Sequence, residues 1–138
     1  MIEMELNKIV IDEKRHDQLI VLKEKGGDKL LPIVIGLNEA SAIKFKISGF
    51  TPPRPLTHDL LYATIGNLEA RIDKIIIDKL EENTFHAKIV LLTSSGKTLL
   101  VDARPSDSIA LSVRAHAPIF VEEEVFKNSE PFNQNQQT

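Results

Sequence analysis

The chain has 138 residues, of which 42% are hydrophobic and 27% charged, and these values are typical of one globular domain with one core. The absence of cysteine excludes disulfides, thiolate nucleophiles and cysteine-ligated zinc. A formal net charge of −3 argues against capture of nucleic acid by a general positive field, so such binding would need a local basic patch or a bound metal. Because the acidic start does not resemble a secretory signal and no segment reaches transmembrane length, we expect a soluble, cytoplasmic protein with no membrane role.

The first third of the chain predicts three strands. Residues 2–11 alternate between apolar and polar side chains, residues 19–25 form a second apolar segment, and two glycines at 26–27 predict a hairpin turn into a third strand at 30–35. The third segment is continuously apolar, which predicts a central place in the sheet.

Two helices are expected next. Asn38 is a candidate cap for the first, which would end at Gly49. Thr57 is a candidate cap for the second, in which an apolar stripe recurs at the helical spacing, formed by Leu61, Ile65 and Leu68.

The second half predicts a three-stranded meander at 69–102, with turns at 81–84 and 94–96, and then a third helix that Pro118 ends. Residues 119–125 are a final short strand or the start of a helix, and residues 127–138 are a polar tail that we expect to be disordered. The fold class is therefore α+β, with two antiparallel meanders and three helices in a single domain at 1–126.

Three polar clusters stand where a loop opens a helix. The first contains Glu39, the second Arg54, His58 and Asp59, and the third Asp102, Arg104 and Asp107. Helix N-termini present free N–H groups and the positive end of the helix dipole, so they attract phosphates and carboxylates. If the fold brings the three openings together, they could form one anion-binding cleft.

The histidine and the aspartate of the second cluster each have two interpretations. A carboxylate in the first turn, such as Asp59, relieves the helix dipole without any substrate. An imidazole is not a favoured group at that position, so His58 is expected to stay neutral and able to act as a base, although a structural role stays open. The other histidines lack a comparable cluster: His16, His86 and His116.

The two arginines also have two interpretations. Three prolines surround Arg54 and hold its backbone extended, which suits a residue that receives a phosphate or carboxylate. Alternatively, Arg54 pairs with a carboxylate of the fold, such as Glu39 or Asp107. For Arg104 the simplest account is a local ion pair with Asp107 that secures the start of the third helix.

The carboxylates of these clusters are sufficient for a Mg²⁺ or Mn²⁺ site that would polarise a phosphodiester and lower the pKa of a bound water. The candidate ligands are Glu39, Asp59, Asp102 and Asp107. No P-loop, dinucleotide-binding, zinc-protease or nucleophile-elbow motif is present, so those classes of enzyme are excluded.

Four stretches together resemble the bifunctional nuclease domain family over about residues 1 to 126. They are LPIVIGLNEASAI, PPRPLTHDLL, LEARIDKIIIDKLEENTFHAKIVL and LLVDARPSDSIALSVRAHAPIFVEEEV. Ser108 stands where the family usually has alanine, and Val113 also varies. The resemblance implies an α+β fold, frequent homodimers and degradation of both RNA and DNA, and its signature residues are those of the three clusters.

These observations predict a hydrolase of RNA and DNA phosphodiester bonds. In that hypothesis His58 is the general acid or base, and Arg54 and Arg104 bind phosphate oxygens. The acidic residues orient groups or bind metal: Glu39, Asp59 and Asp107. Two alternatives stay open, namely a non-catalytic regulatory or binding module with a structural ion-pair cluster, and an enzyme that acts on a small anionic metabolite.

Overall fold

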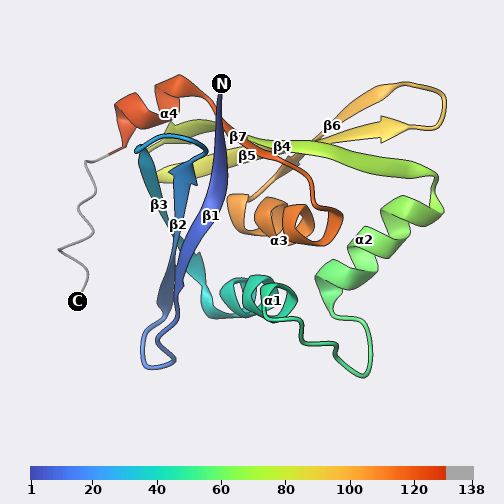
Figure 1. Cartoon of the computed structure of the whole chain (residues 1–138), viewed down its shortest axis with the longest axis horizontal. Coiled ribbons are helices and arrows are strands. Elements are labelled where there is room, and N and C mark those ends of the chain that lie inside the picture. Colours follow the sequence, from blue (N-terminus) through green and yellow to red (C-terminus); the bar gives the residue numbers. More distant parts are fainter. Residues whose placement is uncertain (130–138) are drawn as a thin grey trace.

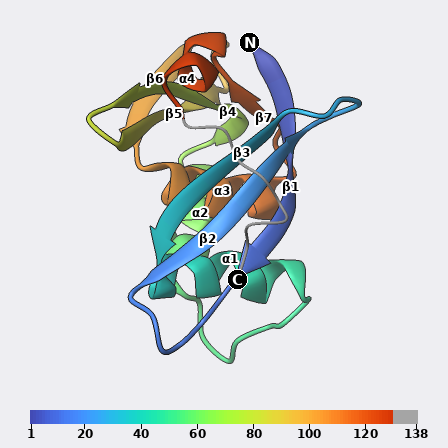
Figure 2. The same ribbon diagram turned by 90° about the vertical axis from the view of Figure 1, so that its left-hand side faces the viewer.

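A computed structural model describes residues 1–129 and shows one open, mixed sheet of seven strands with four helices (Figures 1 and 2). The strands are β1 Ile2–Val10, β2 Asp17–Glu24, β3 Leu30–Gly36, β4 Ala70–Glu81, β5 Thr84–Thr93, β6 Thr98–Ala103 and β7 Ile119–Val121. The helices are α1 Leu37–Ile47, α2 Thr57–Asn67, α3 Pro105–Ala115 and α4 Glu123–Asn128. The α+β class and the single domain are confirmed.

The short strand β7 joins the two expected meanders into one sheet with the order β3-β2-β1-β7-β4-β5-β6. It pairs antiparallel with β1 and parallel with β4, whereas all other neighbours are antiparallel. Both proposals for residues 119–125 are therefore correct in part, since β7 is followed directly by α4, a fourth helix that the sequence interpretation did not count. Lys127 and Asn128, which were expected to begin the disordered tail, form the end of α4, and residues 130–138 of that tail lie outside the described residues.

The prediction that the third strand is central is wrong, because β3 is at the edge of the sheet. Its side chains alternate, with Leu31 and Ile33 buried and Val34 61% exposed, so only one face is covered. Pro32 stands within this edge strand and has no N–H group to offer a further strand. A continuous apolar run alone did not distinguish one-sided from two-sided burial.

Helix α3 lies in the angle between the two parts of the twisted sheet, next to α1 and α2 (Figure 1). Pro105 occupies its first turn, where the missing N–H costs nothing, and most of its residues are buried. The small side chains of Ser106, Ser108 and Ala110 let neighbouring elements pack closely around it. This helix is therefore the centre of the core and holds the first turns of α1 and α2 near its own.

The two expected helix caps are displaced by one or two residues. Gly36 rather than Asn38 caps α1, and Leu56 rather than Thr57 caps α2. The leucine side chain at the cap of α2 has no polar atom. Instead, the Asp59 carboxylate reaches back to the cap, where the Leu56 N–H donates to its Oδ2 at 2.9 Å.

The apolar stripe expected on α2 is mostly exposed. Leu61 and Leu68 are 41% and 76% exposed, and Ile65 is the member that packs against the core. Among the described residues, no helix combines the length and the apolar composition needed to cross a membrane. The cytoplasmic location stays a prediction.

Candidate functional site

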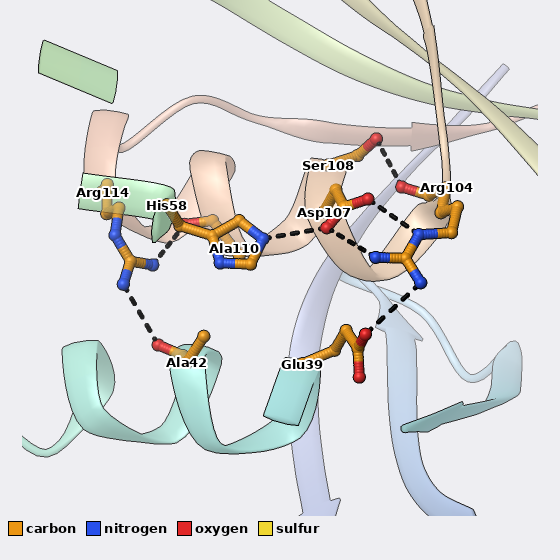
Figure 3. A network of polar contacts seen from close by, with 8 residues as sticks. All are labelled: Glu39, Ala42, His58, Arg104, Asp107, Ser108, Ala110 and Arg114. Carbon is orange, nitrogen blue, oxygen red and sulfur yellow. Dashed lines mark hydrogen bonds and ion pairs between the residues drawn. The ribbon is translucent and has the colours of Figure 1, made fainter. Parts of the chain in front are cut away.

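The first turns of α1, α2 and α3 border one cleft with a volume of about 420 Å³. Glu39 enters it from α1, His58 from α2, and Asp107 from α3, with Arg104 at the residue that caps α3 (Figure 3). The structure thus brings together four of the seven residues selected from the sequence. Their common position at helix starts is what places them side by side.

Asp107 is the centre of a chain of hydrogen bonds in this cleft. Arg104 donates from Nε to Oδ2 at 2.9 Å and from Nη2 to Oδ1 at 3.1 Å, which makes a two-pronged pair. On its other side Oδ1 is 2.9 Å from Nε2 of His58, and Arg104 also donates from Nη1 to Oε1 of Glu39 at 3.3 Å. The expected local pair is therefore present and extends to two further helices (Figure 3).

The ionised state of Asp107 is favoured by these contacts. Burial would by itself raise the pKa of its carboxyl, but the hydrogen bonds from Arg104 and His58, together with the Arg104 charge, outweigh burial and lower the pKa. Asp107 is consequently a carboxylate at neutral pH and accepts hydrogen bonds without donating any.

This carboxylate determines which nitrogen of His58 carries the proton. An acceptor at Nε2 requires the proton there, so the neutral ring has its lone pair on Nδ1. Figure 3 shows Nδ1 on the side of the ring that faces α1, and within residues 1–129 it has no hydrogen-bond partner. The ring is 14% exposed, which fits a base that substrate can reach but that bulk water does not surround.

Arg104 retains capacity to bind an anion. Its guanidinium has five N–H donors, and three are engaged with Asp107 and Glu39. The side chain is 64% exposed, so the other donors face solvent. The cleft nevertheless holds one arginine charge against two carboxylate charges, and it is not a strongly positive site by itself.

Asp59 does not join this chain of contacts. Its Oδ1 accepts a 2.7 Å bond from Nε of Arg114, and its Oδ2 accepts the Leu56 N–H. Burial would raise the pKa of this carboxyl, but the Leu56 hydrogen bond and the Arg114 ion pair together lower it. Asp59 therefore combines the expected helix-start role with an unexpected ion pair between helices.

Arg114 was not selected from the sequence, although it is the most deeply buried charge described. Its side chain is 3% exposed, and it also donates to the carbonyl oxygens of Ala110 and Ala42. A signal was available, because Arg114 follows Ala110 and Leu111 at the spacing of the buried stripe of α3. A cation on that stripe needs a carboxylate partner from another element.

Two of the selected residues lie elsewhere. Arg54 is exposed in the loop before α2 and, within residues 1–129, makes no ion pair, so the alternative that it pairs with Glu39 or Asp107 is wrong. Asp102 is on β6 with a side chain 77% exposed, where it pairs with Lys88 at 3.3 Å. Asp102 is therefore outside the cleft, although it precedes Arg104 by only two residues.

The carboxylates proposed as metal ligands do not meet as one set. Asp59 is held by Arg114, Asp102 by Lys88, and the remaining two share Arg104 between them. Within residues 1–129 no group of three or more histidine, aspartate or glutamate side chains could hold a metal ion. The described residues therefore contain no site with three protein ligands for Mg²⁺ or Mn²⁺, and the metal requirement stays a prediction.

An open α+β sheet with a histidine, a carboxylate and an arginine at three helix starts defines a domain with a polar cleft suited to acid–base chemistry on an anion. The sequence model of the bifunctional nuclease domain matches residues 20–133. This chain belongs to the bifunctional nuclease domain family.

Relatives extend over most of the chain. An uncharacterised protein of Mycobacterium tuberculosis is 39% identical over 123 residues, which are 89% of this chain and 73% of that protein. A protein of Oryza sativa subsp. indica named bifunctional nuclease 1, and one of Oryza minuta named bifunctional nuclease, are each 21% identical over 120 residues. The matched region is 86% of this chain but 36% of each rice protein, so these relatives are much longer.

Proposed function

We propose that this protein is a nuclease that hydrolyses phosphodiester bonds of RNA and DNA in the cleft between α1, α2 and α3. The observation that carries the proposal is His58, whose Nε2 is bound by the Asp107 carboxylate while Nδ1 is unpartnered among the described residues. Family membership and the names of the rice relatives support the same class of reaction.

The residues have distinct roles in this proposal. Nδ1 of His58 takes a proton from a water molecule, and the water oxygen attacks phosphorus as the bond to the leaving oxygen breaks. The imidazolium then gives the proton to the leaving oxygen. Asp107 fixes the tautomer and stabilises the imidazolium. The unused N–H donors of Arg104 bind non-bridging phosphate oxygens, and Glu39 holds the guanidinium in place. Because water is the nucleophile, no 2′-hydroxyl is required and both RNA and DNA are substrates.

The test compares cleavage of single-stranded RNA and of plasmid DNA by wild type, His58→Ala and Arg104→Ala. Loss of the base should reduce the rate about 10²-fold or more. His16→Ala is the matched control, since His16 is exposed in a turn outside the cleft and its loss should not change the rate. Equal rates in wild type and His58→Ala would refute the assignment, and parallel reactions with a chelator would report whether a metal takes part.

A second candidate function is a non-catalytic regulatory or binding module. The observation that favours it is that Arg104 is paired on both sides, with Asp107 and with Glu39, so the group that should bind substrate phosphate is already compensated. In that case wild type cleaves neither nucleic acid. A thermal melt with nucleotides and with small phosphate or carboxylate metabolites then identifies the ligand, because a ligand that binds the native state raises Tm.

We further propose that the protein is a homodimer joined at β6 and α2, which both lie on the right-hand side of Figure 1. Within residues 1–129, β6 pairs with β5 alone, and three consecutive apolar residues on it are exposed, with Leu100 65% exposed. Leu60 and Leu68 of α2 are 60% and 76% exposed. An unpaired apolar edge can pair antiparallel with the same edge of a second copy, whereas the β3 edge carries Pro32.

A further inference from the structure

A second depression, which we call the hollow, adjoins the cleft and has a volume of about 300 Å³. It is lined by Lys46 in the last turn of α1, by Phe50 and Arg54 in the loop between α1 and α2, and by Asp59 in the first turn of α2. The wall between cleft and hollow consists of the same two segments, since Phe45 and His58 line the cleft side.

The charges of the hollow differ from those of the cleft. Arg54 and Lys46 are exposed, and neither forms an ion pair within residues 1–129. The carboxylate in the hollow, Asp59, is compensated by Arg114. The hollow thus presents two cations that form no ion pair within residues 1–129, although the charge of Lys46 also acts on Asp59. The neighbouring cleft has more carboxylates than arginines, so an anionic polymer is attracted to the hollow.

Two aromatic rings stand on the wall. Phe45 and Phe50 have ring centroids 5.1 Å apart and are 40% and 52% exposed. The turn that ends α1 holds the pair in place. Gly49 has φ +77°, and its N–H donates to the Lys46 carbonyl. The Phe50 N–H donates to the Phe45 carbonyl at 3.0 Å. The rings therefore have a fixed place beside the two cations.

An apolar contact between these two positions is a common way to close a helix, and leucine would serve for that purpose. Helix closure accounts for the contact but not for two half-exposed rings in a chain with six phenylalanines and one tyrosine. Aromatic faces beside cations are the combination with which proteins bind single-stranded nucleic acid, because unpaired bases stack on rings while phosphates contact arginine and lysine.

We infer that the hollow is the subsite for the nucleotide next to the cleaved phosphodiester, and that the substrate is single-stranded. Its base stacks on the Phe45–Phe50 pair, and its phosphate lies on Arg54 and Lys46. This inference rests on the proposed function for the position of the cleaved bond, but binding of a single strand can be measured without cleavage. A duplex cannot use the rings, because its bases are already stacked and paired.

The experiment measures binding of a fluorescent oligothymidylate, and of a duplex of the same length, to His58→Ala protein, so that the oligonucleotide stays intact. Phe50→Ala and Phe50→Leu are added to this background. Phe50→Leu is the decisive variant, because leucine keeps the apolar contact that closes α1 but provides no ring. We expect both variants to bind the single strand about tenfold more weakly, whereas Phe50→Tyr should bind like the parent.

The cations are tested by salt dependence. Replacement of Arg54 or Lys46 by glutamine should reduce the slope of log affinity against log salt by about 0.7 each, since each contact with a single-stranded phosphate releases about that number of counterions. The matched control is Lys97→Gln, because Lys97 lies in the turn between β5 and β6, away from both depressions. Its slope should equal that of the parent.

The outcomes separate this inference from the proposed function. Equal affinity for duplex and single strand, undetectable binding of either, or Phe50→Leu protein that binds like the parent would overturn the subsite even if the enzyme cleaves. Conversely, wild type that does not cleave but binds a single strand through Phe50 and Arg54 would refute the nuclease and retain the single-strand binding site in the hollow.

Discussion

Arg114 on α3 donates from Nε to Oδ1 of Asp59 on α2 across 2.7 Å, and its side chain is 3% exposed. The same guanidinium donates to the carbonyl oxygen of Ala42 on α1, so one buried charge connects the three helices that carry the site residues. Arg104, the residue that caps α3, also pairs with carboxylates, but it is 64% exposed and lies in the cleft. The two ion pairs therefore serve different purposes, since one holds the helices together and the other lies in the cleft where the substrate is proposed to bind.

Replacement of Arg114 by methionine should destabilise the protein far more than the same change at Arg104. Loss of one partner from a buried pair leaves an uncompensated charge and costs about 3–5 kcal/mol. Loss of an exposed pair costs about 1 kcal/mol or less. Urea denaturation of the two variants gives the free energies of unfolding, and similar losses in both would contradict the assignment of roles.

Stability should fall in acid because of Asp59 and Asp107. Both carboxyl groups have pKa values below the ordinary 3.8 in the folded protein, so folding favours their ionised forms. That contribution is fully present above the unfolded pKa and is lost as pH falls through the lower, folded pKa. Unfolding free energies of wild type and Asp59→Asn measured from neutral pH into acid should differ in slope below about pH 4. If the unfolding free energy of the variant fell with pH as steeply as that of wild type, Asp59 would not be linked to folding in this way.

Asp107→Asn should reduce the proposed nuclease activity, because the proton of the His58 ring would no longer be held on Nε2. An amide can present either oxygen or NH₂ to Nε2, so the proton is no longer restricted to that nitrogen. We expect kcat to fall by about 10²-fold, with a smaller effect on KM. The ¹⁵N resonances of the ring report the tautomer independently of activity, and an unchanged Nε2–H form in the variant would contradict this role.

Leu100→Asp on β6 should convert the proposed homodimer into a monomer, because a charge would replace an apolar side chain at the joined edge. Val34→Asp is a matched control, since Val34 is 61% exposed on β3 at the opposite edge of the sheet. Sedimentation velocity measures the assembly size. A wild-type monomer, or equal dissociation by both substitutions, would refute this dimer surface.

Local features of the fold were predictable because they depend on neighbouring residues. Strand alternation, the glycine turn after β2 and the proline at the start of α3 each act within a few positions, and the expected elements match the observed ones closely. The place of β3 at the sheet edge was not predictable in this way, because burial depends on which elements cover a strand. The exposed stripe of α2 shows the same limit, since helical spacing indicates an apolar face but not its partner.

The sequence by itself determined that polar residues open three helices and that His58, Asp107 and Arg104 are candidates for chemistry. The tertiary structure decided their partners: Glu39 pairs with Arg104, 65 positions away, and Asp59 pairs with Arg114, 55 positions away. It also placed Arg54 in the hollow rather than in the cleft. The physical reason is that ion pairs form over a few ångströms in space, whereas periodicity and capping act over a few residues of the chain.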